Sequence, residues 1–132
     1  MKTSLLSHAT AKAAPEARWH DDDEMRWAVR QWATKIGVRT PQIHLRRMKR
    51  KWASISTTGR LTLDSGLLHL PKKLGEFVIV HELVHLIAPN HGKVFKSFLL
   101  AYLPDWEKRE QELKRYVKQS DKATDAWSQK EM

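Results

Sequence analysis

The chain has 132 residues, 41% of them apolar, with no cysteine and a formal net charge of +9 at pH 7. This length and apolar content predict one domain with its own hydrophobic core, and the lack of cysteine excludes a disulfide framework and fits a reducing compartment. No run of 18 or more apolar residues occurs, which excludes a membrane-spanning helix, and we expect a cytoplasmic protein.

Residues 1–20 are expected to form a flexible arm, because their only apolar run is too short for a secretory signal. A first helix is predicted over about residues 23–36. Acidic residues occupy positions 21–24, where a helix N-terminus favours them, and Gly37 is a natural stop. The apolar residues that recur at helical spacing are Met25, Val29, Trp32, Ala33 and Ile36.

Two or three antiparallel strands are predicted next, over about residues 42–48, 52–57 and 60–64. These segments alternate apolar and polar side chains and are rich in β-favouring residues. The pair Thr58-Gly59 is typical of a turn between the last two strands. Because so small a sheet is only marginally stable alone, we expect a buried helix against one of its faces.

The stretch Leu74–Ala88 predicts that buried helix, because it is apolar on most sides. Pro71 fits the first helical turn, where its missing N–H is not needed, and Pro89 should end the helix at about Ala88. Glu82 conflicts with this apolar setting, since burying an unpartnered carboxylate costs several kcal/mol. A divalent cation nearby would remove the conflict.

The same helix carries the run His81-Glu82-Leu83-Val84-His85, and His91 follows after five further residues. Two histidines four residues apart on a helix lie on one face, so both imidazoles can reach one ion. Three protein ligands leave a fourth position for water, which is the arrangement of a catalytic zinc site. We expect one Zn²⁺ per chain on His81, His85 and His91, with Glu82 placed to take a proton from the bound water.

Two further helices are predicted, over about residues 92–103 and 105–118, because apolar side chains again recur at helical spacing. Residues 120–132 are polar and are expected to form a tail. The predicted fold class is therefore α+β, within a domain over residues 21–119. It combines an N-terminal helix, a small antiparallel sheet, the buried histidine helix and two C-terminal helices.

Basic residues are concentrated in one part of the chain. Residues 39–80 carry nine basic and two acidic side chains, which gives +7 of the net charge of +9. The densest cluster consists of Arg46, Arg47, Lys49, Arg50 and Lys51. This basic cluster fits a nucleic acid or an acidic partner, and it fits as well a solvated face that keeps a small protein soluble. Both interpretations are open at this point.

A wider pattern extends over residues 22–118. It consists of the run Lys51–Ser56, a β-hairpin, the run Val78–His85, the run Pro89–Gly92 with Phe95, and the run Tyr102–Asp105. In this combination the chain resembles the YgjP-like zincin metallopeptidases, which are related in architecture to the SprT-like proteases. The resemblance implies a compact zincin-like domain in which His81, His85 and His91 bind zinc and Glu82 is the catalytic base.

We therefore expect a zinc-dependent metallopeptidase that hydrolyses peptide bonds in a peptide or protein substrate through a metal-activated water. Glu82 is expected to act as general base and to pass the proton of that water to the leaving amine. The strand near Leu61–Leu63 is the expected edge on which an extended peptide pairs.

Two alternatives stay open. A metal-dependent endoribonuclease is one, because the histidine spacing also resembles the YbeY-like ribosome-maturation enzymes and the basic segment suits RNA. Those enzymes lack the glutamate beside the first histidine and have a glycine in the second spacer, where this chain has Ala88-Pro89. The other is a DNA- or RNA-binding module with a vestigial zinc site, for which binding would depend strongly on salt without hydrolysis.

Overall fold

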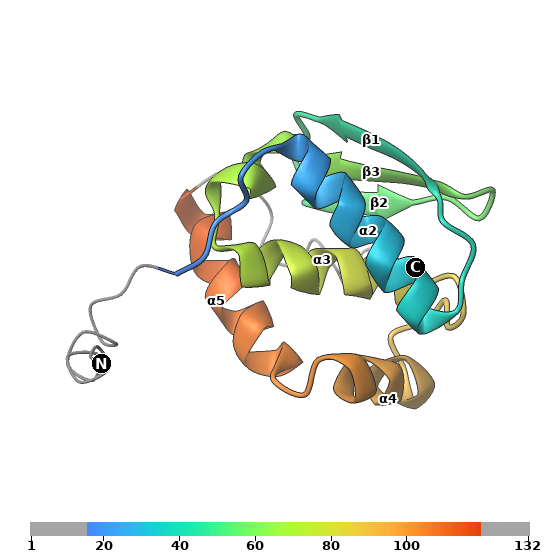
Figure 1. Cartoon of the computed structure of the whole chain (residues 1–132). Helices are drawn as coiled ribbons and strands as arrows, with labels where there is room; N and C mark the ends of the chain where they lie inside the picture. Colours follow the sequence, from blue (N-terminus) through green and yellow to red (C-terminus); the bar gives the residue numbers. More distant parts are fainter. Residues whose placement is uncertain (1–15, 120–132) are drawn as a thin grey trace, which may run out of the picture.

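A computed structural model describes residues 16–119 (Figure 1). Within them, four α-helices and a three-stranded sheet form an α+β fold, as the sequence predicts. Residues 1–15 of the expected arm and the expected tail at 120–132 lie outside the described residues. The elements are α2 (Asp22–Ile36), β1 (Gln42–Arg46), β2 (Ala53–Ile55), β3 (Arg60–Asp64), the short 3₁₀-helix η1 (Ser65–His69), α3 (Lys72–Val84), α4 (Lys93–Tyr102) and α5 (Trp106–Gln119).

Helix α2 begins and ends close to the predicted positions, and both ends have a physical cause. The side chain of Asp21 accepts a hydrogen bond of 2.9 Å from the backbone N–H of Glu24, which caps the N-terminus. Gly37 adopts φ 88° and its N–H donates to the carbonyl of Ala33 at 2.9 Å, which ends the helix. The buried face of α2 packs against α3.

The sheet is mixed, with the strand order β1-β3-β2, so the expected all-antiparallel sheet is wrong for one of its two pairings. Strand β2 pairs with β3 in antiparallel fashion, from Ala53 opposite Leu63 to Ile55 opposite Leu61. Strand β1 pairs with β3 in parallel, because residues 47–59, which include β2, carry the chain back to the end of the sheet at which β1 began.

This strand order also corrects the expected peptide-binding edge. Strand β3, which contains Leu61–Leu63, lies between β1 and β2 and is hydrogen-bonded on both sides. It has no open edge on which a peptide could add, so that expectation is wrong. Within the described residues, β1 and β2 are the two edges of the sheet.

Helix α3 is the centre of the molecule. Figure 1 shows it under the sheet, with α4 and α5 on the side away from the strands. All its side chains from Leu74 to Val84 are buried except Glu76, which agrees with the apolar sequence. The α-helix ends at Val84 rather than at the expected Ala88. The next turn is tighter, because the N–H groups of residues 85–87 bond three residues back, for example Leu86 to Leu83 at 3.0 Å.

The segment just before α2 packs on the start of α3. The carbonyl of Ala17 accepts a hydrogen bond of 2.8 Å from the N–H of Lys72, Arg18 forms an isolated bridge with Pro71, and Trp19 is buried. Ala17, Arg18 and Trp19 are therefore packed on α3 and do not form part of a free arm.

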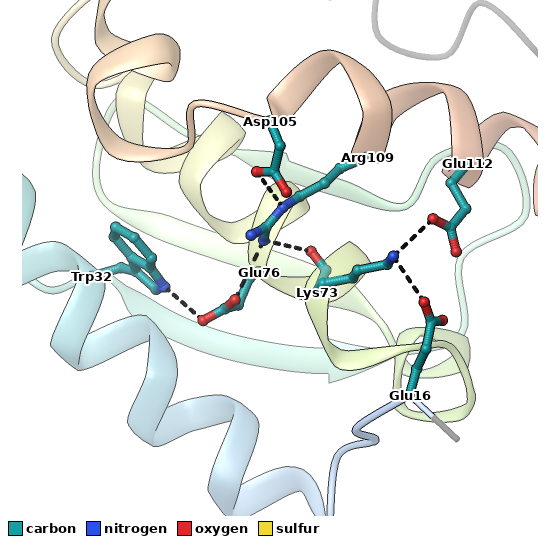
Figure 2. Close-up of polar contacts among 7 residues, drawn as sticks. All are labelled: Glu16, Trp32, Lys73, Glu76, Asp105, Arg109 and Glu112. Carbon is teal, nitrogen blue, oxygen red and sulfur yellow. Dashed lines mark hydrogen bonds and ion pairs between the residues drawn. The ribbon is translucent and has the colours of Figure 1, made fainter. Parts of the chain in front are cut away.

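A polar network fastens α5 to α3 (Figure 2). The ammonium of Lys73 lies 2.8 Å from Glu16 and 3.1 Å from Glu112, so it joins the N-terminal segment, α3 and α5. Arg109 of α5 donates to the backbone carbonyl of Lys73 at 3.0 Å and to Asp105 at 2.9 Å. These contacts hold α5 across the first turn of the histidine helix.

Candidate metal centre

The structure brings the three histidines of the sequence motif together. His81 and His85 lie at the C-terminal end of α3, and His91 lies in the loop that leads to α4. His81 is 2% exposed, whereas His85 and His91 are half-buried. The cluster therefore has a buried side and a side open to solvent, which a substrate needs in order to approach it.

The spacing of the three imidazoles fits a metal ion. One ring nitrogen from each lies within 4.8 Å of the others. The Nε2 atoms of His85 and His91 lie 2.8 Å apart, which is shorter than the roughly 3.4 Å that separates two nitrogens on one tetrahedral zinc ion, so the two rings must move slightly apart to bind one ion. Neutral imidazole nitrogens without a thiolate form the donor set of a catalytic rather than a structural site.

Glu82 is fully buried next to this cluster. Its Oε2 atom lies 3.3 Å from Nδ1 of His81. A carboxylate in a site shielded from water interacts strongly with nearby cations and proton donors, because the local dielectric is low. The structure therefore puts the one carboxylate of the motif within contact of a histidine of the cluster.

Phe95 completes the centre and is a residue whose role the sequence analysis missed. Its ring centroid lies 5.0 Å from that of His81, 4.6 Å from that of His85 and 4.7 Å from that of His91. The ring comes from the first turn of α4 and is 2% exposed. In the sequence, the position of Phe95 four residues after His91 was the one indication of this role. The helical spacing of apolar residues had already accounted for Phe95 as a core residue.

The basic cluster is partly beside this centre. Arg46, Arg47, Lys49 and Arg50 are exposed, whereas Lys51 is half-buried. A pocket of about 300 Å³ connects Lys51 with His85, and the sequence analysis did not foresee it. Its lining consists of Lys51, Ser54, Ile55, Ser56, Thr57, His85, Leu86 and Pro89.

The other described histidines, His20, His44 and His69, are exposed. No helix within residues 16–119 has the length and apolar character needed to cross a lipid bilayer.

Comparison with known proteins agrees with this geometry. Residues 10–116 match the metallopeptidase domain of YgjP-like proteins. The chain belongs to the YgjP-like family. The match covers most of the sequence, so this YgjP-like protein is a metallopeptidase and therefore a hydrolase of peptides or proteins. The comparisons give no support to the endoribonuclease or to the nucleic-acid-binding alternative.

Solved structures share the fold of this YgjP-like protein. Crystal structures of two metallopeptidase zymogens are similar to it. Pyrococcus abyssi abylysin is 22% identical with a TM-score of 0.64, over 74% of this chain and 96% of that one. Methanocaldococcus jannaschii jannalysin is 24% identical with a TM-score of 0.64, over 70% of this chain and 96% of that one. The likeness confirms the predicted zincin-like fold class. No curated protein matches the sequence.

Proposed function

We propose that this YgjP-like metallopeptidase binds one Zn²⁺ per chain through His81, His85 and His91. The observation that carries the proposal is the convergence of the three ring nitrogens within 4.8 Å of one another. Imidazole nitrogen is a preferred zinc ligand, and three-histidine sites leave a position for water. The buried ring of Phe95 supports the proposal, because it packs on all three imidazoles and limits their rotation.

We propose Glu82 as the general base. When bound, the cation lowers the pKa of a water and polarises the carbonyl of the scissile peptide bond. In the proposed reaction Glu82 accepts the proton of the attacking water and passes it to the leaving amine. Two features support this role, namely the burial of Glu82 and its position beside His81. His81 in turn packs edge-on against Phe77, at 5.7 Å between ring centroids.

The proposed peptide path runs along β2. The N–H of Asp64 binds the carbonyl of Trp52 at 2.8 Å, and the N–H of Ser56 binds the carbonyl of Arg60 at 2.9 Å. Because hydrogen-bonding residues alternate along an antiparallel ladder, the polar backbone groups of Ala53 and Ile55 point away from β3. An extended peptide could pair with them as a further strand. The pocket beside His85 follows the same strand, which supports this path.

The test combines metal content with hydrolysis. The purified protein is expected to contain about one zinc per chain, and His85→Ala is expected to lose it. Glu82→Gln keeps the metal ligands and the shape of the side chain but removes the base, so it should retain zinc and lose hydrolysis of a peptide mixture. Full hydrolysis by Glu82→Gln would contradict the assignment of the base. Unchanged zinc content in His85→Ala would contradict the ligand set.

A further inference from the structure

The pocket beside His85 has an uneven chemical lining. Among the described residues that line it, Lys51 is the only lysine, arginine or carboxylate, and the others are three hydroxyl side chains, apolar side chains and His85 itself. The pocket therefore presents one positive charge and several hydroxyls next to a proposed metal ligand. A side chain that entered it from a bound peptide would lie close to the peptide bond being cleaved.

Among the residues that the structure describes, Lys51 lacks the carboxylate partner that comparable lysines have. Lys72 and Lys73, whose side chains are 32% and 39% exposed, both form ion pairs with glutamates. Lys51 is also half-buried, and within residues 16–119 no carboxylate forms an ion pair with it. A partly desolvated ammonium binds a carboxylate more strongly than a fully hydrated one does. The charge of Lys51 therefore favours the binding of a negatively charged group in the pocket.

The backbone around Lys51 is fixed by one buried residue. The carboxylate of Asp64, which is 4% exposed, accepts a hydrogen bond of 3.1 Å from the N–H of Met48. The N–H of Asp64 donates to the carbonyl of Trp52 at 2.8 Å, and the Trp52 side chain is 2% exposed. Both ends of the short loop that carries Lys51 are therefore held, so the backbone at Lys51 is preorganised beside the pocket and little loop ordering opposes binding.

We propose that this pocket recognises an acidic side chain, glutamate or aspartate, next to the scissile bond of the substrate, and that Lys51 determines this specificity. The inference rests on the proposed peptidase function and adds the substrate class. The hydroxyls of Ser54 and Thr57 can donate to the same carboxylate. The exposed members of the basic cluster raise the positive potential around the pocket and favour the approach of acidic segments.

Cleavage-site analysis tests the proposal on the full-length zinc-loaded protein. The substrates are synthetic peptides of equal length that carry Glu, Gln or Lys at each position in turn, and mass spectrometry locates the cut bonds. We expect Glu to be preferred over Gln by about tenfold at one fixed position from the cut, the size of one charge-assisted hydrogen bond. Lys51→Glu should move that preference to Lys. Lys114→Glu makes the same charge change on an exposed residue of α5 and should leave the ranking unchanged.

Binding to Glu82→Gln provides a readout that does not depend on turnover. A fluorescein-labelled peptide with the preferred glutamate, followed by anisotropy, should bind about tenfold more weakly when Lys51→Glu is added. If no peptide is cleaved by the wild-type protein, the proposed function fails, and a labelled hexapeptide of glutamates then tests the pocket alone.

Three results would overturn the specificity proposal while leaving the peptidase function intact. One is that the wild-type protein cleaves the Glu peptide and the Gln peptide at equal rates. Another is an unchanged preference in Lys51→Glu. The third is that the protein binds a single-stranded oligonucleotide more tightly than the acidic peptide and that Lys51→Glu weakens the binding of both by the same factor. This result would assign the pocket to a nucleic-acid surface.

Discussion

The indole ring of Trp19 lies directly against the backbone of Gly75 in the histidine helix. A Cβ atom at Gly75 would lie 2.6 Å from Nε1 and 2.9 Å from Cζ2 of that ring, closer than real Cβ atoms approach other heavy atoms. Trp19 is buried and belongs to the same core as α3. Only glycine therefore allows the segment before α2 to close over the start of α3.

Replacing Gly75 with alanine is expected to destabilise the protein. Alanine favours a helix by about 1 kcal/mol over glycine, but displacing a buried indole ring costs roughly 1–3 kcal/mol. We expect the free energy of unfolding in urea to fall despite the better helix propensity. Gly92→Ala is the control, because a Cβ there meets no atom within 4 Å, and its effect should stay below about 1 kcal/mol. A stabilised Gly75→Ala variant would show that Trp19 does not pack there.

Local patterns were enough to predict the helices and the clustering of the three histidines. Apolar side chains at helical spacing located α2, α4 and α5 within one or two residues of their observed bounds. The motif from His81 to His85 needed only the geometry of a helix, and His91 followed from its spacing. Each of these features depends on residues close together in the sequence.

The features that could not be predicted depend on residues far apart. The parallel pairing of β1 with β3 depends on where the chain returns, which alternation within a strand does not reveal. Lys51 and His85 line one pocket only because β2 packs against α3. Trp19 gave no signal for its packing on Gly75, because nothing in the short segment at residues 16–20 predicts a contact with a helix more than fifty residues away.

Arg109 is predicted to contribute more to stability than Lys73. The side chain of Arg109 is 16% exposed and binds Asp105, the carbonyl of Lys73 and, at 3.4 Å, Glu76 (Figure 2). The side chain of Lys73 is 39% exposed, so solvent screens its two ion pairs. Arg109→Met should cost roughly 1–3 kcal/mol and Lys73→Met less than about 1 kcal/mol, as measured by urea unfolding. Equal losses would contradict this ranking.

Glu24 is predicted to contribute to stability in a pH-dependent way. The hydrogen bond from Lys72 and then that from the N–H of His20 hold the pKa of Glu24 below its usual value of 4.5. The unfolded state therefore binds more protons, so this stabilisation is present above about pH 4.5 and is lost as the pH falls through the lower pKa of the folded state.

Replacement of Glu24 by Gln should consequently lower the melting temperature at pH 7 and have a smaller effect near pH 3. Asp23→Asn is the matched control, because Asp23 lies in the same helical turn and forms no ion pair with a residue of the described part of the chain. A loss of stability that is the same at both pH values would exclude the ion pair with Lys72 as its cause.

Removal of metal is predicted to destabilise the protein. A ligand that binds only the folded state stabilises it by about 4 kcal/mol at a thousandfold excess over its dissociation constant. The melting temperature of the zinc-loaded protein should therefore fall when a chelator is added. His85→Ala should melt at the same temperature with and without the chelator. A chelator effect of equal size in both proteins would show that the stabilising ion binds elsewhere.

Phe95 is predicted to position the zinc ligands without touching the reacting atoms. Its ring packs on all three imidazoles, so Phe95→Leu keeps most of the buried apolar volume but releases their orientation. Loss of such a supporting contact typically costs roughly 10–100-fold in metal affinity. Competition with a zinc-sensitive dye measures this loss.

Phe98→Leu is the control on the same helix, because Phe98 stacks on Tyr102 instead, at 6.5 Å between ring centroids. It should lose some stability and retain zinc affinity. Equal affinity in the two variants would mean that the histidines orient themselves without Phe95.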